Sequence, residues 1–197
     1  MAKIIGGLVI VLLLSMFVIS CTGSDLPTQY GLVQRHIINC AVPESVANWQ
    51  ERELACRAEG RCINPGVTEL QEIAWLAQGM LDHKKDDVDY TQTSCEANES
   101  QKGDCEDFGA LAYRLLSEAG YPESKIGMVL LVDFGNHDPV TGSYFGHTVP
   151  VVYIDDFDFW ILDNGFLTFV VSRASEFLES SRLSLYCGYN LTEYWIY

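Results

Sequence analysis

The strongest constraint on the fold is a helix-like segment that begins at Cys105 and precedes a series of strand-like runs. Its apolar residues recur at the period of one helix face: Phe108, Leu111, Ala112, Leu115, Leu116 and Ala119. Asp104 suits the N-cap, and Gly120 with Pro122 ends the helix. The apolar face of this helix needs a partner of similar size.

The second half of the chain supplies that partner as a predicted antiparallel sheet. Four apolar or alternating runs rich in Val, Ile and aromatic residues cover residues 126–134, 148–154, 157–162 and 166–171. Residues 172–197 add a short helix and a closing strand. The fold class is therefore α+β, with the helix that starts at Cys105 packed on the sheet.

The segments before Cys105 are less regular. The pattern predicts a short helix over residues 46–57, an amphipathic helix over 67–83 with Thr68 as its N-cap, and a long acidic loop over 84–104. At 197 residues the chain is sized for one domain. We divide it into a leader (1–21), a cysteine-containing N-terminal extension (22–66) and the main domain (67–197).

The leader indicates export. Lys3 precedes a sixteen-residue uncharged, mostly apolar run over residues 4–19, and Val18-Ile19-Ser20-Cys21 resembles a bacterial lipobox. Three alternatives stay open: a lipoprotein lipidated on Cys21, a cleaved secretory signal, and an uncleaved anchor. We expect a periplasmic or cell-envelope location, with secretion as the alternative. Membrane contact is expected only through the leader or the lipid.

The net charge excludes one class of partner. With 12 Lys and Arg against 27 Asp and Glu, the chain carries −15, so a nucleic acid would be repelled. Cationic partners and divalent cations are favoured instead.

The chain has seven cysteines, six of them after Cys21. In an exported protein, six cysteines ordinarily form three disulfides. If Cys105 is free, two disulfides and one spare thiol remain among the other five, which are Cys40, Cys56, Cys62, Cys95 and Cys187. We expect Cys40, Cys56 and Cys62 to crosslink the N-terminal segment, although the spacing fixes no pairing.

Cys105 is a candidate nucleophile. A thiolate at a helix N-terminus meets the positive end of the helix dipole and unpaired backbone N–H groups. Glu106 and Asp107 add opposing negative charge, which an imidazolium or a bound cation would offset.

The candidate base is His147, with Asp163 to orient it. An antiparallel hairpin centred on Asp155-Asp156 places these two residues opposite each other or one place apart. A thiol, an imidazole and a carboxylate in contact form the arrangement used for nucleophilic catalysis. His137 is the alternative base, although its Asn-His-Asp-Pro context is typical of a loop.

Three short motifs together resemble a known family. Gly103-Asp104-Cys105-Glu106-Asp107-Phe108, Gly146-His147-Thr148 and Trp160-Ile161-Leu162-Asp163-Asn164 are similar to segments of the bacterial transglutaminase-like cysteine proteinases, which include LapG-type periplasmic proteases. The resemblance spans roughly residues 68–171. It implies a papain-like or transglutaminase-like core in which Cys105 is the nucleophile, His147 the general base and acid, and Asp163 the orienting carboxylate.

The same resemblance implies a calcium site. LapG-type members bind Ca²⁺ through acidic residues that flank the cysteine, and these positions match Asp104 and Glu106. Carboxylate oxygens suit this hard cation. Asp104 is also the natural N-cap, so the residue has a purely structural explanation as well.

The resulting hypothesis is an exported cysteine endopeptidase that cleaves protein or peptide substrates through an acyl-enzyme. Two alternatives stay open. Transglutaminase-type acyl transfer would use the same intermediate, and a disulfide-stabilised envelope binding module would have Cys105 paired and inert.

Overall fold

The structure is a computed structural model that describes residues 36–37, 42–60, 63, 66, 68–84, 90–155, 158–163 and 171–197. The predicted leader, Cys21, Cys40 and Cys62 lie outside these residues. Within the described ranges, no helix has the length and apolar character that crossing a membrane requires.

An antiparallel sheet forms the middle layer of the molecule. Its seven described strands run in the order β1-β9-β8-β4-β5-β6-β7. Their bounds are β1 His36–Ile37, β4 Ile126–His137, β5 Tyr144–Tyr153, β6 Phe159–Leu162, β7 Val171–Arg173, β8 Ser184–Tyr189 and β9 Tyr194–Ile196. The predicted mixed α+β class with an antiparallel sheet is confirmed.

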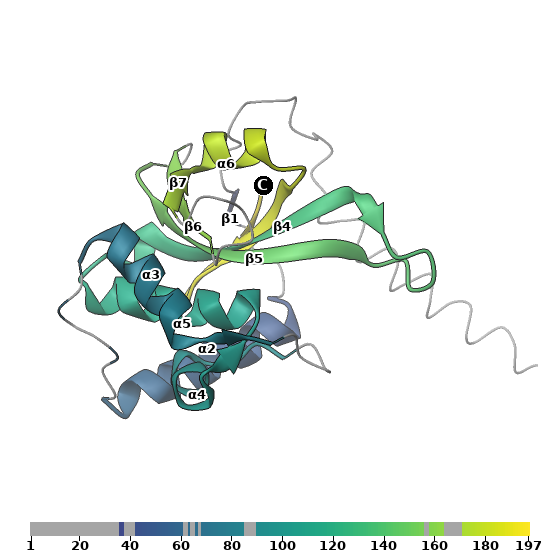
Figure 1. The fold of residues 1–197 in the computed structure, drawn as a ribbon. Helices are drawn as coiled ribbons and strands as arrows, with labels where there is room; N and C mark the ends of the chain where they lie inside the picture. Colours follow the sequence, from purple (N-terminus) through teal and green to yellow (C-terminus); the bar gives the residue numbers. More distant parts are fainter. Residues whose placement is uncertain are drawn as a thin grey trace, which may run out of the picture.

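Helices cover both faces of the sheet (Figure 1). One face carries α2 (Glu44–Ala58), α3 (Leu70–Met80), α4 (Ser94–Ser100) and α5 (Cys105–Glu118), and the other carries α6 (Ala174–Ser180). A 3₁₀ turn, η1 (Glu123–Lys125), links α5 to β4. A short parallel ladder of β2 (Asp82–His83) and β3 (Lys102–Gly103) lies beside the start of α5.

The predicted helix at Cys105 is the centre of the first core. Phe108, Leu111 and Leu115 of α5 are at most 2% exposed, and complete burial of each contributes about 1.5–3 kcal/mol. Gly109 lets α5 approach the sheet closely, because a Cβ there would lie 2.8 Å from the Met128 side chain. Trp49 of α2 belongs to this core and makes edge contacts with the rings of Tyr113 and Tyr189.

The sheet separates this core from a second one. Met128 of β4 packs in the α5 core, whereas its neighbours Val129 and Leu131 pack beneath α6 with Phe177. This alternation follows from the two-residue period of a strand. On β4 and β5, residues with even numbers therefore face the α5 side of the sheet, and residues with odd numbers face the α6 side.

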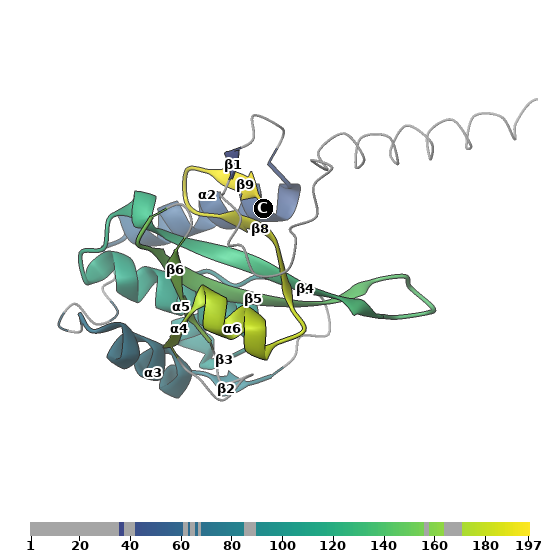
Figure 2. The same cartoon turned by 90° about the horizontal axis from the view of Figure 1, so that it is seen from above.

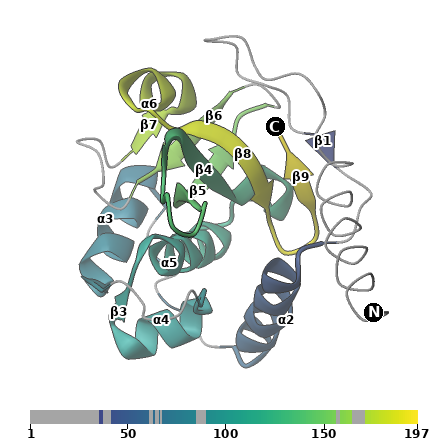
Figure 3. The same ribbon diagram turned by 90° about the vertical axis from the view of Figure 1, so that its right-hand side faces the viewer.

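The central strands continue past the body of the molecule. Residues 134–145, here named the β4–β5 arm, project from the sheet as a hairpin (Figures 1 and 2). Seen from the end of this arm, α2 and α5 lie on the same side of the sheet (Figure 3).

Several local predictions differ from the structure. The segment predicted as a loop over 84–104 contains α4, because Thr93 and Glu96 form a capping box whose signal is hidden by the polar composition. The β5 strand begins at Tyr144, four residues before the predicted start, because the arm extends it. Thr68 is not the N-cap of α3, since Glu69 holds that position.

Cys56 of α2 forms a disulfide with Cys95 of α4, with the two Cα atoms 6.2 Å apart. Cys56 therefore links the N-terminal segment to α4, through a partner that the spacing of the cysteines did not fix. Burial explains the pairing: both half-cystines lie on helix faces that pack together, at most 5% exposed. Cys105 and Cys187 are free thiols.

We expect the Cys56–Cys95 bond to stabilise the fold by about 2–4 kcal/mol, because it closes a 39-residue separation in the unfolded chain. Cys56→Ser, Cys95→Ser and the double variant should lose this amount equally in guanidinium denaturation, since one bond can be lost only once. Additive losses in the double variant would contradict the pairing.

Candidate active site

Asp107 fixes the start of α5. Its carboxylate is fully buried and accepts hydrogen bonds from the Gln92 backbone N–H at 2.8 Å, the Gln92 Nε2 at 2.7 Å and the Asp104 backbone N–H at 3.2 Å. Gly103 leaves the room this needs, because a Cβ there would lie 2.4 Å from the Asp107 carboxylate. From the sequence, Asp107 was identified only as an opposing charge beside Cys105. The three-residue spacing from the N-cap was the available signal for its structural role.

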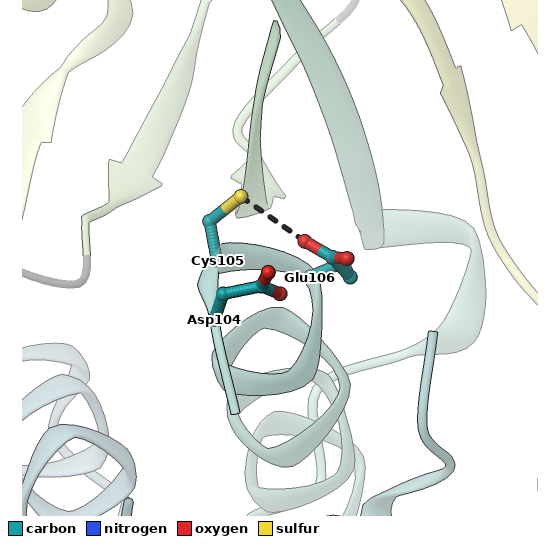
Figure 4. Close-up of side chains that lie close together, drawn as sticks. All are labelled: Asp104, Cys105 and Glu106. Carbon is teal, nitrogen blue, oxygen red and sulfur yellow. Dashed lines mark hydrogen bonds between the residues drawn. The ribbon is translucent and has the colours of Figure 1, made fainter. Parts of the chain in front are cut away.

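Cys105 is the first residue of α5, and its sulfur lies between a carboxylate and a strand. The thiol donates to Glu106 Oε2 at 3.2 Å (Figure 4). The backbone N–H of Thr148 on β5 points at the same sulfur. The helix tip therefore meets β5 at Thr148. His147 pairs with Leu131 of β4, whose side chain packs in the core beneath α6, so His147 lies on the opposite face of the sheet from the cleft.

Burial, followed by the charge of Glu106, raises the pKa of the Cys105 thiol to about 12. The Thr148 amide works in the opposite direction but is outweighed. The thiol is therefore protonated near neutral pH in this arrangement. Activation requires that the negative charge beside it be neutralised or that a base accept the proton.

His147 and Asp163 form a buried pair. Nε2 of His147 lies 2.7 Å from Asp163 Oδ1, and the two residues are 3% and 0% exposed. The β5–β6 register, with Val151 opposite Ile161, places Asp163 opposite Val149. The contact is therefore diagonal, two residues along β5 from the opposite position rather than at or next to it. Diagonal neighbours share a face of the sheet and remain within reach of long side chains.

The other predicted site residues lie in two different places. Asp104, Cys105 and Glu106 bring one ligand atom each to within 4.8 Å of one another. His137 is at the end of β4 on the projecting arm, where its ring centroid lies 6.1 Å from that of Tyr144.

The pair Asp104 and Glu106 suits a hard cation. Asp104 Oδ1 is buried and has no hydrogen-bond partner among the described residues. Burial, followed by the hydrogen bond with Asp104, raises the pKa of Glu106 to about 8. Two adjacent carboxylates in a partly buried turn are stabilised when a divalent cation shares their oxygens. The thiol between them is a softer donor that Ca²⁺ does not favour.

A cleft of about 990 Å³ opens over Cys105 and Glu106. Its lining comes from α2, the 90–91 segment, the tip of α5 and strands β4, β5, β8 and β9. Gly146 and Thr148 line it from β5, whereas His147 and Asp163 are buried outside the lining.

One wall of the cleft was not foreseen from the sequence. Arg52 of α2 donates to the Thr91 carbonyl and to Glu96 Oε2, each at 2.6 Å, and its guanidinium stacks over Tyr90. These contacts tie α2 to the segment that precedes α4. No local pattern marks Arg52, because its partners are about 40 residues away in the chain.

Comparison with solved structures places this α+β fold in a known class. Three structures of LapG from Legionella pneumophila match it. The calcium-bound form has a TM-score of 0.52 at 20% identity over 64% of this chain and 66% of that one. A second structure has a TM-score of 0.53 at 17% identity over 79% and 90%, and the EGTA-treated form has 0.54 at 18% over 80% and 88%.

These matches confirm the resemblance to the LapG-like proteins at the level of fold. No protein-family model matches the chain, and no curated protein sequence matches it significantly.

We expect Glu106→Gln to speed alkylation of Cys105 by iodoacetamide at pH 9 in EGTA, because Glu106, whose pKa is about 8, carries its charge there. Removing the carboxylate charge lowers the thiol pKa, and each unit of lowering raises the thiolate population about tenfold. Mass spectrometry of the Cys105 peptide separates this label from labels on other thiols. Glu176→Gln, on the opposite face of the sheet, is the control. An unchanged rate in Glu106→Gln would show that Glu106 does not hold the pKa up.

Proposed function

We propose that this protein is a cysteine endopeptidase in which Cys105 is the nucleophile, His147 the general base and acid, and Asp163 the orienting carboxylate. The observation that carries the proposal is the meeting of the α5 tip with β5. A free thiol opens into the cleft and lies against the Thr148 amide, and the preceding residue, His147, is paired with a buried carboxylate. The LapG fold supports the same assignment.

The pairing through Nε2 defines the role of each ring nitrogen. Asp163 accepts the Nε2 proton and favours the tautomer in which Nδ1 is the base. The proposed reaction requires this ring to reach the Cys105 thiol, so that Nδ1 takes its proton as the sulfur attacks the substrate carbonyl. The backbone N–H groups at the start of α5 stabilise the oxyanion. The imidazolium returns its proton to the leaving amine, and water activated by the same ring hydrolyses the thioester.

Asp104 and Glu106 are proposed to hold Ca²⁺. The cation, when bound, supplies positive charge beside the thiol and offsets the two carboxylates. This relieves the charge that holds the pKa of Cys105 high, and the calcium-bound match among the solved structures supports the choice of metal.

The two alternatives are distinguished by chemistry. The inert module requires a paired Cys105, and the free Cys105 thiol among the described residues favours the enzyme over this module. Amine transfer would use the same thioester, so adding a primary amine during peptide cleavage tests it. The proposal expects the free carboxylic acid as the main product, whereas a dominant amide product would favour acyl transfer.

The location follows from the leader, which lies outside the described residues. We retain the proposal of an exported, periplasmic or envelope-bound protein that acts on protein or peptide substrates.

We expect Cys105→Ala and His147→Ala each to lower kcat/KM for unfolded β-casein at least about a thousandfold, with no further loss in the double variant, because the residues act as one unit. Asp163→Asn should also lower it, since the ring loses its orienting acceptor. His137→Ala is the matched control and should retain activity. Loss in His137→Ala with retention in His147→Ala would reverse the assignment of the base.

Calcium should raise the melting temperature of the wild-type protein, because a ligand that binds only the folded state stabilises it. EGTA should abolish the shift and lower casein cleavage. Asp104→Asn and Glu106→Gln should remove the calcium-dependent shift, whereas Glu176→Gln should keep it. A shift that survives both site variants would place the calcium elsewhere.

A further inference from the structure

Three aromatic rings from three strands form an exposed cluster at one end of the cleft. Phe134 of β4, Tyr144 of β5 and Tyr186 of β8 are 46%, 52% and 44% exposed. The ring centroid of Phe134 lies 5.5 Å from that of Tyr144 and 6.4 Å from that of Tyr186. We name these three residues the aromatic cluster. Exposed aromatic rings that touch one another are typical of binding surfaces.

A bulge in β8 directs Tyr186 into this cluster. Leu130 pairs with Cys187 and the next residue, Leu131, pairs with Leu185, so Tyr186 is the extra residue. Bulges often occur beside functional sites, where they redirect a side chain. Leu185 and Cys187 keep their regular pairing with β4. Tyr186 between them has no pairing partner on β4, and its side chain lines the cleft.

The aromatic cluster is continuous with the position of the thiol. Tyr144, Gly146 and Thr148 occupy alternate positions of β5, and all three line the cleft. Thr148 contacts the Cys105 sulfur through its backbone amide. At about 3.3 Å per residue, Tyr144 lies about 13 Å along the strand from that contact. This distance equals about four residues of an extended peptide.

Gly146 contributes no side chain to the path between them. It is exposed and lines the cleft. Glycine within a strand often marks a place where another backbone approaches closely. The neighbouring side chain is Leu130, whose Cδ1 would lie 3.2 Å from a Cβ at Gly146, so a substrate backbone over Gly146 would contact Leu130.

We propose that the aromatic cluster is a specificity subsite that binds an apolar side chain of an extended substrate segment, about four residues from the scissile bond. The inference deepens the proposed function and rests on it. The occupant is an unfolded or flexible region of a protein substrate, because the path follows one strand from the aromatic cluster to the contact with the sulfur.

Size and charge disfavour a second copy of the chain as the occupant. Three exposed rings offer far less than the roughly 800 Å² that each partner buries in a standard interface. Two copies would each bring a net charge of −15 and repel one another. The acidic residues Asp133 and Asp138 next to the cluster add to that repulsion.

The experiment compares a long and a short peptide around one cleavage site. The sites that the wild-type protein cuts in unfolded β-casein are mapped by mass spectrometry. The best site is then made as a peptide with six residues on each side of the scissile bond and as one with three. Tyr144→Ala and Tyr186→Ala should each lower the long-to-short ratio of kcat/KM about tenfold, as expected for aromatic anchors of a binding surface.

Phe145→Ala is the matched control. Phe145 is the next residue on β5, is 39% exposed and does not line the cleft. Its variant should keep the ratio within about twofold, since neighbouring strand residues point to opposite faces. An unchanged ratio in Tyr144→Ala and Tyr186→Ala, or an equal fall in Phe145→Ala, would overturn the subsite.

A substitution in the substrate tests the contact directly. Replacing by alanine the apolar residue four positions from the scissile bond should slow cleavage by the wild-type protein but have little further effect in Tyr144→Ala. Independent, additive losses would show that the ring and the side chain do not meet.

Failure of the proposed function gives a different result. If the wild-type protein cuts no casein, the protease assignment fails, and the subsite is tested by the fluorescence anisotropy of labelled unfolded casein with Cys105→Ala. Tyr144→Ala and Tyr186→Ala in that background should weaken binding about tenfold, as expected for anchor residues, and Phe145→Ala should not. Equal binding by all variants, or a dimer in sedimentation velocity that Tyr144→Ala dissociates, would overturn the proposal.

Discussion

The concentration of negative charge at one helix start is the constraint on which the rest of the site depends. Asp104, Glu106 and Asp107 place three carboxylates within one turn around the Cys105 thiol. Asp107 is stabilised by hydrogen bonds from Gln92 and from the Asp104 backbone. Oδ1 of Asp104 has no hydrogen-bond partner among the described residues. Burial and the charges of Glu106 and Asp104 keep the thiol protonated. A cation at this turn or an imidazole that reaches the sulfur would resolve the conflict, and the proposed function uses both.

The sheet organises the site by dividing neighbouring residues between different environments. Gly146 and Thr148 face the open cleft, whereas His147 is buried against Asp163. The Thr148 amide contacts the sulfur from within the strand backbone. The cleft can thus be open to a substrate while the imidazole and its carboxylate stay shielded from water, which strengthens their interaction.

The N-terminal helices complete the cleft instead of standing apart from it. Glu53 of α2 is fully buried and accepts hydrogen bonds from the Ser94 backbone N–H at 2.9 Å and from Arg57 Nε at 3.1 Å. The Cys56–Cys95 bond and the Arg52 contacts join the same two helices. This network holds the 90–93 segment, whose Gln92 in turn anchors Asp107 beside the thiol. The α2 wall of the cleft is therefore connected to the start of α5 through the contacts of the 90–93 segment.

The sequence by itself determined the elements whose signals are local. The 3.6-residue period and the caps specify α5, the strand runs specify the antiparallel sheet, and the hexapeptide around Cys105 indicates the LapG-like fold. Only the tertiary structure decided the Cys56–Cys95 pairing, the diagonal contact of His147 with Asp163, and the meeting of Phe134, Tyr144 and Tyr186. Each of these depends on strand register, a bulge or helix packing. Such long-range geometry is set by the burial of whole faces against one another and leaves no periodic trace at the residues that finally touch.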